Sequence, residues 1–145
     1  MTPDEQLLTA IHKTSEMGKN TLDKLKEKCE DNSFLAVIDR QYEEYKRFFM
    51  SADTLLKACE GDDSGVPAGS KVMGDMMIDM ASLRDKSTCH YADMVLKGTE
   101  RGIAELDDAM IKLSSAAKPE TLNLAEALRS VLICNKSELL RIING

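Results

Sequence analysis

The chain has two histidines, and one of them stands beside a carboxylate at helical spacing. His12 precedes Glu16 by one helical turn, so the two side chains could hydrogen-bond to each other or share a metal ion at the surface. His90 lies at the start of another predicted helix. Because side chains one turn apart pair readily without a metal, we predict an ion pair between His12 and Glu16 and keep metal binding as the alternative.

The four cysteines form no CxxC pair and have no zinc-site spacing. Cys29 and Cys59 end two successive antiparallel helices in the predicted fold, so they lie at opposite ends of a bundle and could not bond to each other. We therefore expect all four, Cys89 and Cys134 included, to be free and mostly buried thiols in a reducing compartment.

Two further patterns could indicate metal binding, but each has a simpler structural explanation. The adjacent Asp62 and Asp63 stand in a Gly-rich and Pro-containing loop over 61–69, but the ligand spacing and closing Glu of a calcium-binding EF-hand are missing. A methionine face from Met73 to Met80 could supply thioether ligands to copper or dock a partner. Methionines at helical spacing also fill cores well, which is the explanation we favour, and the role of this face stays open.

Composition favours one soluble, all-helical domain. The chain has 145 residues, of which 30% are charged, and it carries a net charge of −6 with a pI near 5.0. An acidic balance argues against nucleic acid or an anionic membrane as partner. No apolar run is long enough to span a bilayer, and the N-terminus has Pro, Asp and Glu where a signal peptide needs basic residues, so we expect a cytoplasmic protein.

Hydrophobic periodicity predicts five helices in one domain over residues 1–145, at about 3–30, 33–60, 71–86, 89–116 and 119–143. Thr2 is placed to cap the first helix, Pro3 suits its first turn, and Glu5 completes a capping box. Pro119 starts the last helix in the same way.

The second of these helices holds five of the chain's six phenylalanines and tyrosines. Its predicted inward face runs along Leu35, Ile38, Tyr42, Tyr45, Phe49, Ala52, Leu56 and Cys59. The first helix has small residues, Ser15 and Gly18, halfway along its own inward face. We expect these small residues to form a notch that receives Tyr42 and Tyr45, because small residues opposite large ones let two helices approach closely.

The pattern K-x-[ST]-E-x-G-x-x-x-L-D occurs twice, over 13–23 and 97–107, so a second notch is expected at Thr99 and Gly102. This repeat, the four long helices and the helical crossover predicted between the second and third of them resemble the ferritin-like four-helix bundle. More narrowly, the segments 65–73 and 94–103 resemble bacterial ferritin-like domains of unknown function. The resemblance covers nearly the whole chain and implies an all-α fold.

The resemblance also implies a set of metal ligands, of which this chain matches only half. Di-iron members carry one Glu on each of two helices and Glu-x-x-His on the other two. Glu16 and Glu100 correspond to the single carboxylates. Glu44 and Glu138 are each followed three residues later by Arg, which cannot ligate a metal, where the family has His. Our hypothesis is that Glu-Arg salt bridges have replaced the iron.

We therefore expect a non-catalytic ferritin-like bundle with no cofactor, which acts through contacts with a second copy of itself or with another protein. No catalytic residue is predicted, since phosphate loops, nucleophile elbows and Cys/His clusters are missing from the sequence. One alternative is a degenerate oxidase or metal store that holds iron or manganese through Glu16, Glu100, Glu138 and His12. Another is a small-molecule site between the two notches.

Overall fold

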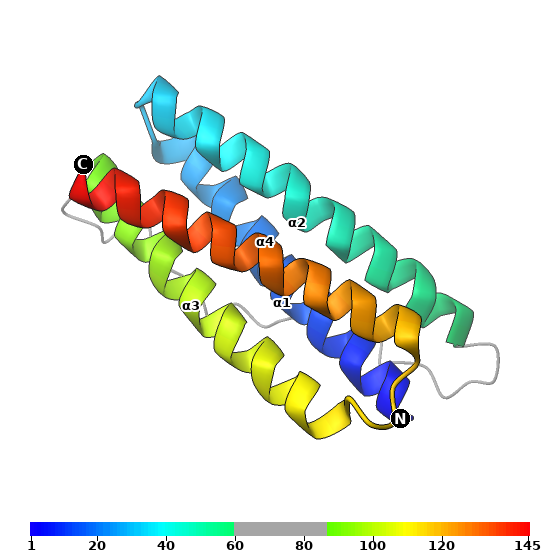
Figure 1. The fold of residues 1–145 in the computed structure, drawn as a ribbon. Coiled ribbons are helices and arrows are strands. Elements are labelled where there is room, and N and C mark those ends of the chain that lie inside the picture. The colour runs from blue at the N-terminus through cyan, green and yellow to red at the C-terminus, as the bar shows by residue number, and fades with distance from the viewer. Residues whose placement is uncertain (60–86) are drawn as a thin grey trace.

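The structure, a computed structural model, describes residues 1–59 and 87–145 and consists there of four long helices that form a bundle (Figure 1). They are α1 (Pro3–Lys28), α2 (Asn32–Cys59), α3 (Thr88–Leu113) and α4 (Pro119–Asn144). The four long predicted helices are thus confirmed within a few residues at each end. The predicted helix over 71–86, the loop over 61–69 and the methionine face from Met73 to Met80 lie outside the described residues.

The helix starts follow the predicted capping residues. The Thr2 hydroxyl oxygen accepts a hydrogen bond from the Glu5 backbone N–H at 3.1 Å and Pro3 occupies the first turn of α1, while Pro119 does so in α4. Ser87 caps α3 by accepting from the His90 backbone N–H at 3.2 Å. Each cap satisfies a donor that the helix itself leaves unpaired.

The described helix α3 ends at Leu113, three residues before the predicted end at 116. Ser114 is the C-cap, and its backbone N–H donates to the Met110 carbonyl. Ser114 and Ser115 are weak helix formers with exposed side chains, so burial does not favour a longer helix at this point.

Hydrogen bonds between helix starts fix the directions of the four helices. The Thr88 hydroxyl at the start of α3 donates to Asp31 Oδ2 at 2.8 Å, just before α2 begins. At the other end the Lys118 backbone N–H donates to Asp4 Oδ1 at 3.0 Å. The helices α2 and α3 therefore run parallel to each other, as do α1 and α4, and α2 ends at the opposite end of the bundle from the start of α3 (Figure 1).

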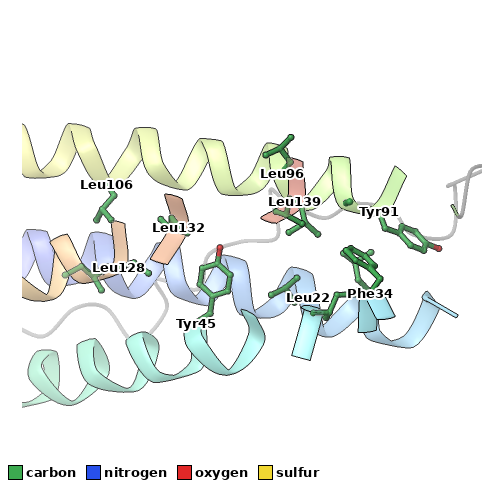
Figure 2. Close-up of a cluster of buried hydrophobic side chains, with 14 of the residues drawn as sticks. Leu22, Phe34, Tyr45, Tyr91, Leu96, Leu106, Leu128, Leu132 and Leu139 are labelled. Carbon is green, nitrogen blue, oxygen red and sulfur yellow. The ribbon is translucent and has the colours of Figure 1, made fainter. Parts of the chain in front are cut away.

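The core runs along the centre of the bundle. α1 packs against α2 and α3, α4 packs chiefly against α3, and α2 and α3 lie diagonally opposite. Leucines supply most of the interior (Figure 2), with Leu22, Leu106, Leu128, Leu132 and Leu139 each no more than 1% exposed. Burying one such side chain contributes about 1.5–3 kcal/mol, so the interior leucines account for much of the stability of the bundle.

The buried face of α2 is rotated relative to the predicted face. Phe34, Ile38, Gln41, Tyr45, Ala52 and Leu56 are buried. The predicted Leu35, Tyr42, Phe49 and Cys59 are only half-buried. Both rows are apolar at helical spacing, and the helices packed beside α2 select the row that contains Phe34.

The described residues contain no β-strand. Among them, none of the helices combines the length and the apolar character that crossing a membrane requires.

Candidate functional site

Tyr45 lies against Gly18 halfway along the bundle, as the sequence predicts. A Cβ atom placed on Gly18 would lie 2.6 Å from Tyr45 Cζ, which is closer than two carbon atoms can approach. The tyrosine ring therefore occupies the space that the missing side chain leaves. In Figure 2 its hydroxyl points from α2 into the interior of the bundle, towards α3.

Thr99 and Asn135 surround the buried phenol. Tyr45 is 3% exposed, Thr99 3% and Asn135 1%. Burial raises the pKa of Tyr45 to about 12, and the Thr99 and Asn135 side chains, which hydrogen-bond to the phenol, act in the opposite direction. Burial thus favours the neutral form of this phenol. We call Gly18, Tyr45, Thr99, Gly102 and Asn135 the central layer.

The two copies of the sequence repeat contribute matching parts to this region. The Ser15 hydroxyl donates to the Ile11 carbonyl at 2.7 Å, and the Thr99 hydroxyl donates to the Val95 carbonyl at 2.8 Å. Both hydroxyls are buried and satisfied one turn back along their own helix. The predicted equivalence of the notches on α1 and α3 is therefore confirmed at these positions.

Sequence reasoning missed one buried polar side chain next to the central layer. Gln41 is fully buried, and its Nε2 donates to Glu138 Oε1 at 3.0 Å. Within residues 1–59 and 87–145, Gln41 Oε1 and Asn135 Nδ2 have no hydrogen-bond partner. The signal that could have found Gln41 is its spacing, since it continues the row of Phe34 and Ile38 towards Tyr45.

A small pocket lies between α1 and α3 at the two notches. Gly18, Gly102, Tyr45, Thr99 and Thr14 are among its lining residues, and its volume is about 30 Å³. That volume exceeds the ~10–15 Å³ that one water molecule requires. It is far below the ~300–1,000 Å³ typical of pockets for drug-sized molecules. The pocket thus lies where the sequence suggested a ligand site but suits water better than an organic cofactor.

His12 and Glu16 lie together between α1 and α2. His12 Nδ1 is 3.8 Å from Glu16 Oε2, and His12 Nε2 is 3.3 Å from Asp53 Oδ1. The imidazole also stacks on Phe49 with ring centroids 4.4 Å apart. The hydrogen bond from Lys57 is the main cause that lowers the pKa of Asp53, and the charges of Lys57 and His12 lower it further. Asp53, which the sequence did not single out, therefore completes a charged cluster on the α1–α2 side.

Glu138 binds a different partner from the one expected. Arg40 of α2 pairs with Glu138 of α4 and with Glu44, the latter at 3.3 Å. The hypothesis assigned Glu44 to Arg47 and Glu138 to Arg141, three residues further along each helix. Arg40 takes their place because it lies one turn before Glu44 and faces α4.

Glu100 is exposed and pairs with Lys136 of α4 at 3.3 Å. Glu16, Glu100 and Glu138 thus sit in three separate ion-paired clusters and do not form the inward-facing carboxylate set that the resemblance implies. In residues 1–59 and 87–145, no group of three or more His, Cys, Asp or Glu side chains is placed to hold a metal ion. Metal binding by these residues and His12 stays a prediction.

Two other expectations are wrong in part. Tyr42 does not enter the notch; its half-buried ring lies under Lys26, whose Nζ is 4.1 Å from the ring centroid. All four cysteines are free, as predicted, but only Cys29 is buried, while Cys89 and Cys134 are exposed. The outer positions of α3 and α4 thus hold thiols where we expected core.

Comparison of the chain with protein-family models, with curated proteins and with solved structures finds no match. Arguments about function therefore rest on the arrangement of these residues.

Proposed function

We propose that this chain is a ferritin-like four-helix bundle without a catalytic centre, which acts through contacts with other protein chains. The observation that carries the proposal is the filling of the central layer by neutral side chains. Tyr45 occupies the middle of the bundle between Gly18 and Thr99. Ferritin-like di-metal proteins place their carboxylates and histidines in the bundle core, facing inward.

The electrostatics of the central layer support this proposal. A site that raises the pKa of a tyrosine to about 12 disfavours negative charge. A cluster of carboxylates would be costly in the same place unless a metal compensated it. The three glutamates that the resemblance assigns to a metal lie instead beside His12, Lys136 and Arg40.

The directions of the helices support the ferritin-like part of the proposal. α2 and α3 are parallel, and α2 ends at the opposite end of the bundle from the start of α3. Ferritin-like folds are compatible with this order of helix directions. The four free thiols are what a cytoplasmic protein would retain, which supports placing this function in the cytoplasm.

Metal titration tests the proposal. We expect purified protein to hold no stoichiometric iron or manganese, and anaerobic addition of Fe(II) to leave its thermal unfolding temperature unchanged. Tight binding of two irons per chain, lost in the Glu16→Ala/Glu100→Ala double variant, would overturn the proposal in favour of a di-metal protein. The double variant Glu27→Ala/Glu43→Ala is the matched control, because it removes the same charge from two exposed positions.

A further inference from the structure

The outer face of α4 is uncharged over most of its length. Between positions 127 and 140 its exposed residues are Ala127, Ser130, Ile133, Cys134, Ser137 and Leu140. We call these six residues the α4 strip. It runs for roughly 20 Å along the helix. By contrast, the exposed positions in the middle of α3 include Lys97, Glu100 and Arg101.

The α4 strip is shaped to receive another helix. Ser130, Cys134 and Ser137 are small, and they let a second backbone come close. Ile133 and Leu140 lie along one side of the strip and are 38% and 37% exposed. Contact with a second helix would remove their apolar surface from water, which is favourable. All six residues are exposed, so this face of α4 points away from the rest of the bundle.

The charges at the two ends of the strip are opposite. Glu126 precedes the strip and Arg141 follows it, and both are exposed. Neither side chain forms an ion pair within the described residues, whereas Arg129, Lys136 and Glu138, which lie between them on α4, each form one. Each end of the strip therefore offers one unpaired charge of known sign.

The small residues and the two end charges of the α4 strip are complementary to the α4 strip of a second copy that runs in the opposite direction. If two α4 helices pack antiparallel about a two-fold axis between Ile133 and Cys134, Glu126 faces Arg141 of the partner subunit. Ser130 then lies opposite Ser137 of the partner subunit, which lets the two backbones approach closely. Two ion pairs form at once, because a two-fold axis repeats every contact.

We propose that the α4 strip is the contact surface of a symmetric homodimer with antiparallel α4 helices. This inference rests on the proposed function and names the partner as a second copy of the chain. A contact made by one helix from each copy is at the small end of interface sizes, so we expect a dissociation constant of about 1–100 μM. The opposite charges at the two ends set the antiparallel orientation.

Sedimentation equilibrium from about 0.5 μM to 1 mM protein, concentrations that bracket the expected range of about 1–100 μM, tests the proposal. We expect concentration-dependent dimerisation that Ile133→Glu shifts to monomer. Glu126→Arg and Arg141→Glu should each weaken the dimer at least about tenfold, since each puts like charges opposite one another. The double variant Glu126→Arg/Arg141→Glu should restore it. Glu43→Arg, an exposed change of the same charge on α2, is the matched control and should leave dimerisation unchanged.

Cys134 gives an independent test, because it lies next to the proposed axis. Oxidation with diamide, which takes up the two electrons and two protons released by a pair of thiols, should link two native chains through Cys134. Cys134→Ser should abolish the covalent dimer, and Cys89→Ser, which removes the other exposed thiol, should not.

A chain that stays monomeric at 1 mM would overturn this inference, as would a dimer that neither Ile133→Glu nor the charge reversals affect. These outcomes are separate from the metal titration. A monomer that binds no iron removes the homodimer but leaves a non-catalytic bundle, whereas a dimer that binds two irons per chain overturns the proposed function alone.

Discussion

A methyl group on Gly18 would enter the space that the Tyr45 ring fills, and this makes Gly18→Ala informative. We expect this variant to be less stable by about 1–3 kcal/mol, because the ring must shift in a packed interior. The better helix propensity of alanine offsets up to about 1 kcal/mol of that cost. Urea unfolding followed by far-UV circular dichroism measures the difference.

Gly102→Ala is the matched control on the equivalent position of the repeat. There a Cβ would meet Thr14 Cγ2 at 3.2 Å, a methyl group that can move slightly. We expect its stability to stay within about 1 kcal/mol of the original protein. Equal destabilisation by the two substitutions would contradict the fit of Tyr45 against Gly18.

Tyr45 also predicts how stability depends on alkaline pH. Its folded pKa of about 12 lies above the ordinary value of 10.0, so the neutral phenol favours the folded state below pH 10. That contribution is lost as the pH rises from 10 to about 12. A shift of this size corresponds to about 3 kcal/mol.

Tyr45→Phe should lack this alkaline loss. At neutral pH we expect it to be less stable by about 1–2 kcal/mol, because Thr99 and Asn135 lose their partner. Urea midpoints measured from pH 8 to 11.5, up to near the pKa of about 12, should show the two stability curves approaching each other. Tyr42→Phe keeps Tyr45 and should retain the alkaline loss. Parallel curves for the original protein and Tyr45→Phe would argue against a buried phenol.

At the scale of the helices, Asp31 joins the starts of α2 and α3. Its Oδ1 accepts from the backbone N–H groups of Ser33 and Phe34, and its Oδ2 accepts from the Thr88 hydroxyl. The Thr88 hydrogen bond is the main cause that lowers the pKa of Asp31, followed by the bond from Phe34. The ionised carboxylate thus stabilises the fold above its unfolded pKa of about 3.9.

We expect Asp31→Ala to lower the thermal unfolding temperature at pH 7. The difference in unfolding temperature from the original protein should shrink as the pH falls from about 3.9 through the lowered pKa of folded Asp31. In that range the original protein loses the same negative charge, because Asp31 becomes protonated. Thr88→Val should show a smaller deficit, since it keeps the cap of α2. A deficit that is as large at pH 2 as at pH 7, on either side of the ordinary pKa of about 3.9, would contradict this role of Asp31.

At the scale of the whole molecule, each end of the bundle gathers two helix starts around one carboxylate. Asp31 serves α2 and α3, and Asp4 accepts from the Lys118 backbone N–H where α4 begins beside α1. Helix N-termini carry partial positive charge, and two parallel helices bring two such ends together. The carboxylates offset this charge, so the direction of the helices and the placement of acidic residues support each other.

Between these ends, the central layer places polar side chains in the core. Asn135 belongs to this layer and Gln41 lies next to it, and each has one buried polar atom with no partner among the described residues. Polar groups in a core destabilise it unless they are satisfied, but they also restrict which helix registers are acceptable. This layer therefore fixes the height at which α2 and α4 meet.

The sequence by itself determined the helices, their starts and the contact of Tyr45 with Gly18. Local rules suffice to find the N-cap Thr2 and the first-turn prolines Pro3 and Pro119, because these residues act within one turn of a helix start. The repeat in α1 and α3 indicated the two notches because small residues at core positions require a large neighbour. The helix starts depend only on residues close together in the chain. The notch contact depends only on one large side chain that fits against the small residues.

Only the tertiary structure decided which face of α2 is buried and which charges pair. The rows containing Phe34 and Leu35 are both apolar, and packing against α1 and α4 selects between them. Arg40 reaches Glu138 and Lys136 reaches Glu100 across helices, whereas the sequence reveals only partners one turn apart. The physical reason is that a helical pattern specifies positions around its own axis, while the rotation of that axis towards its neighbours depends on the whole bundle.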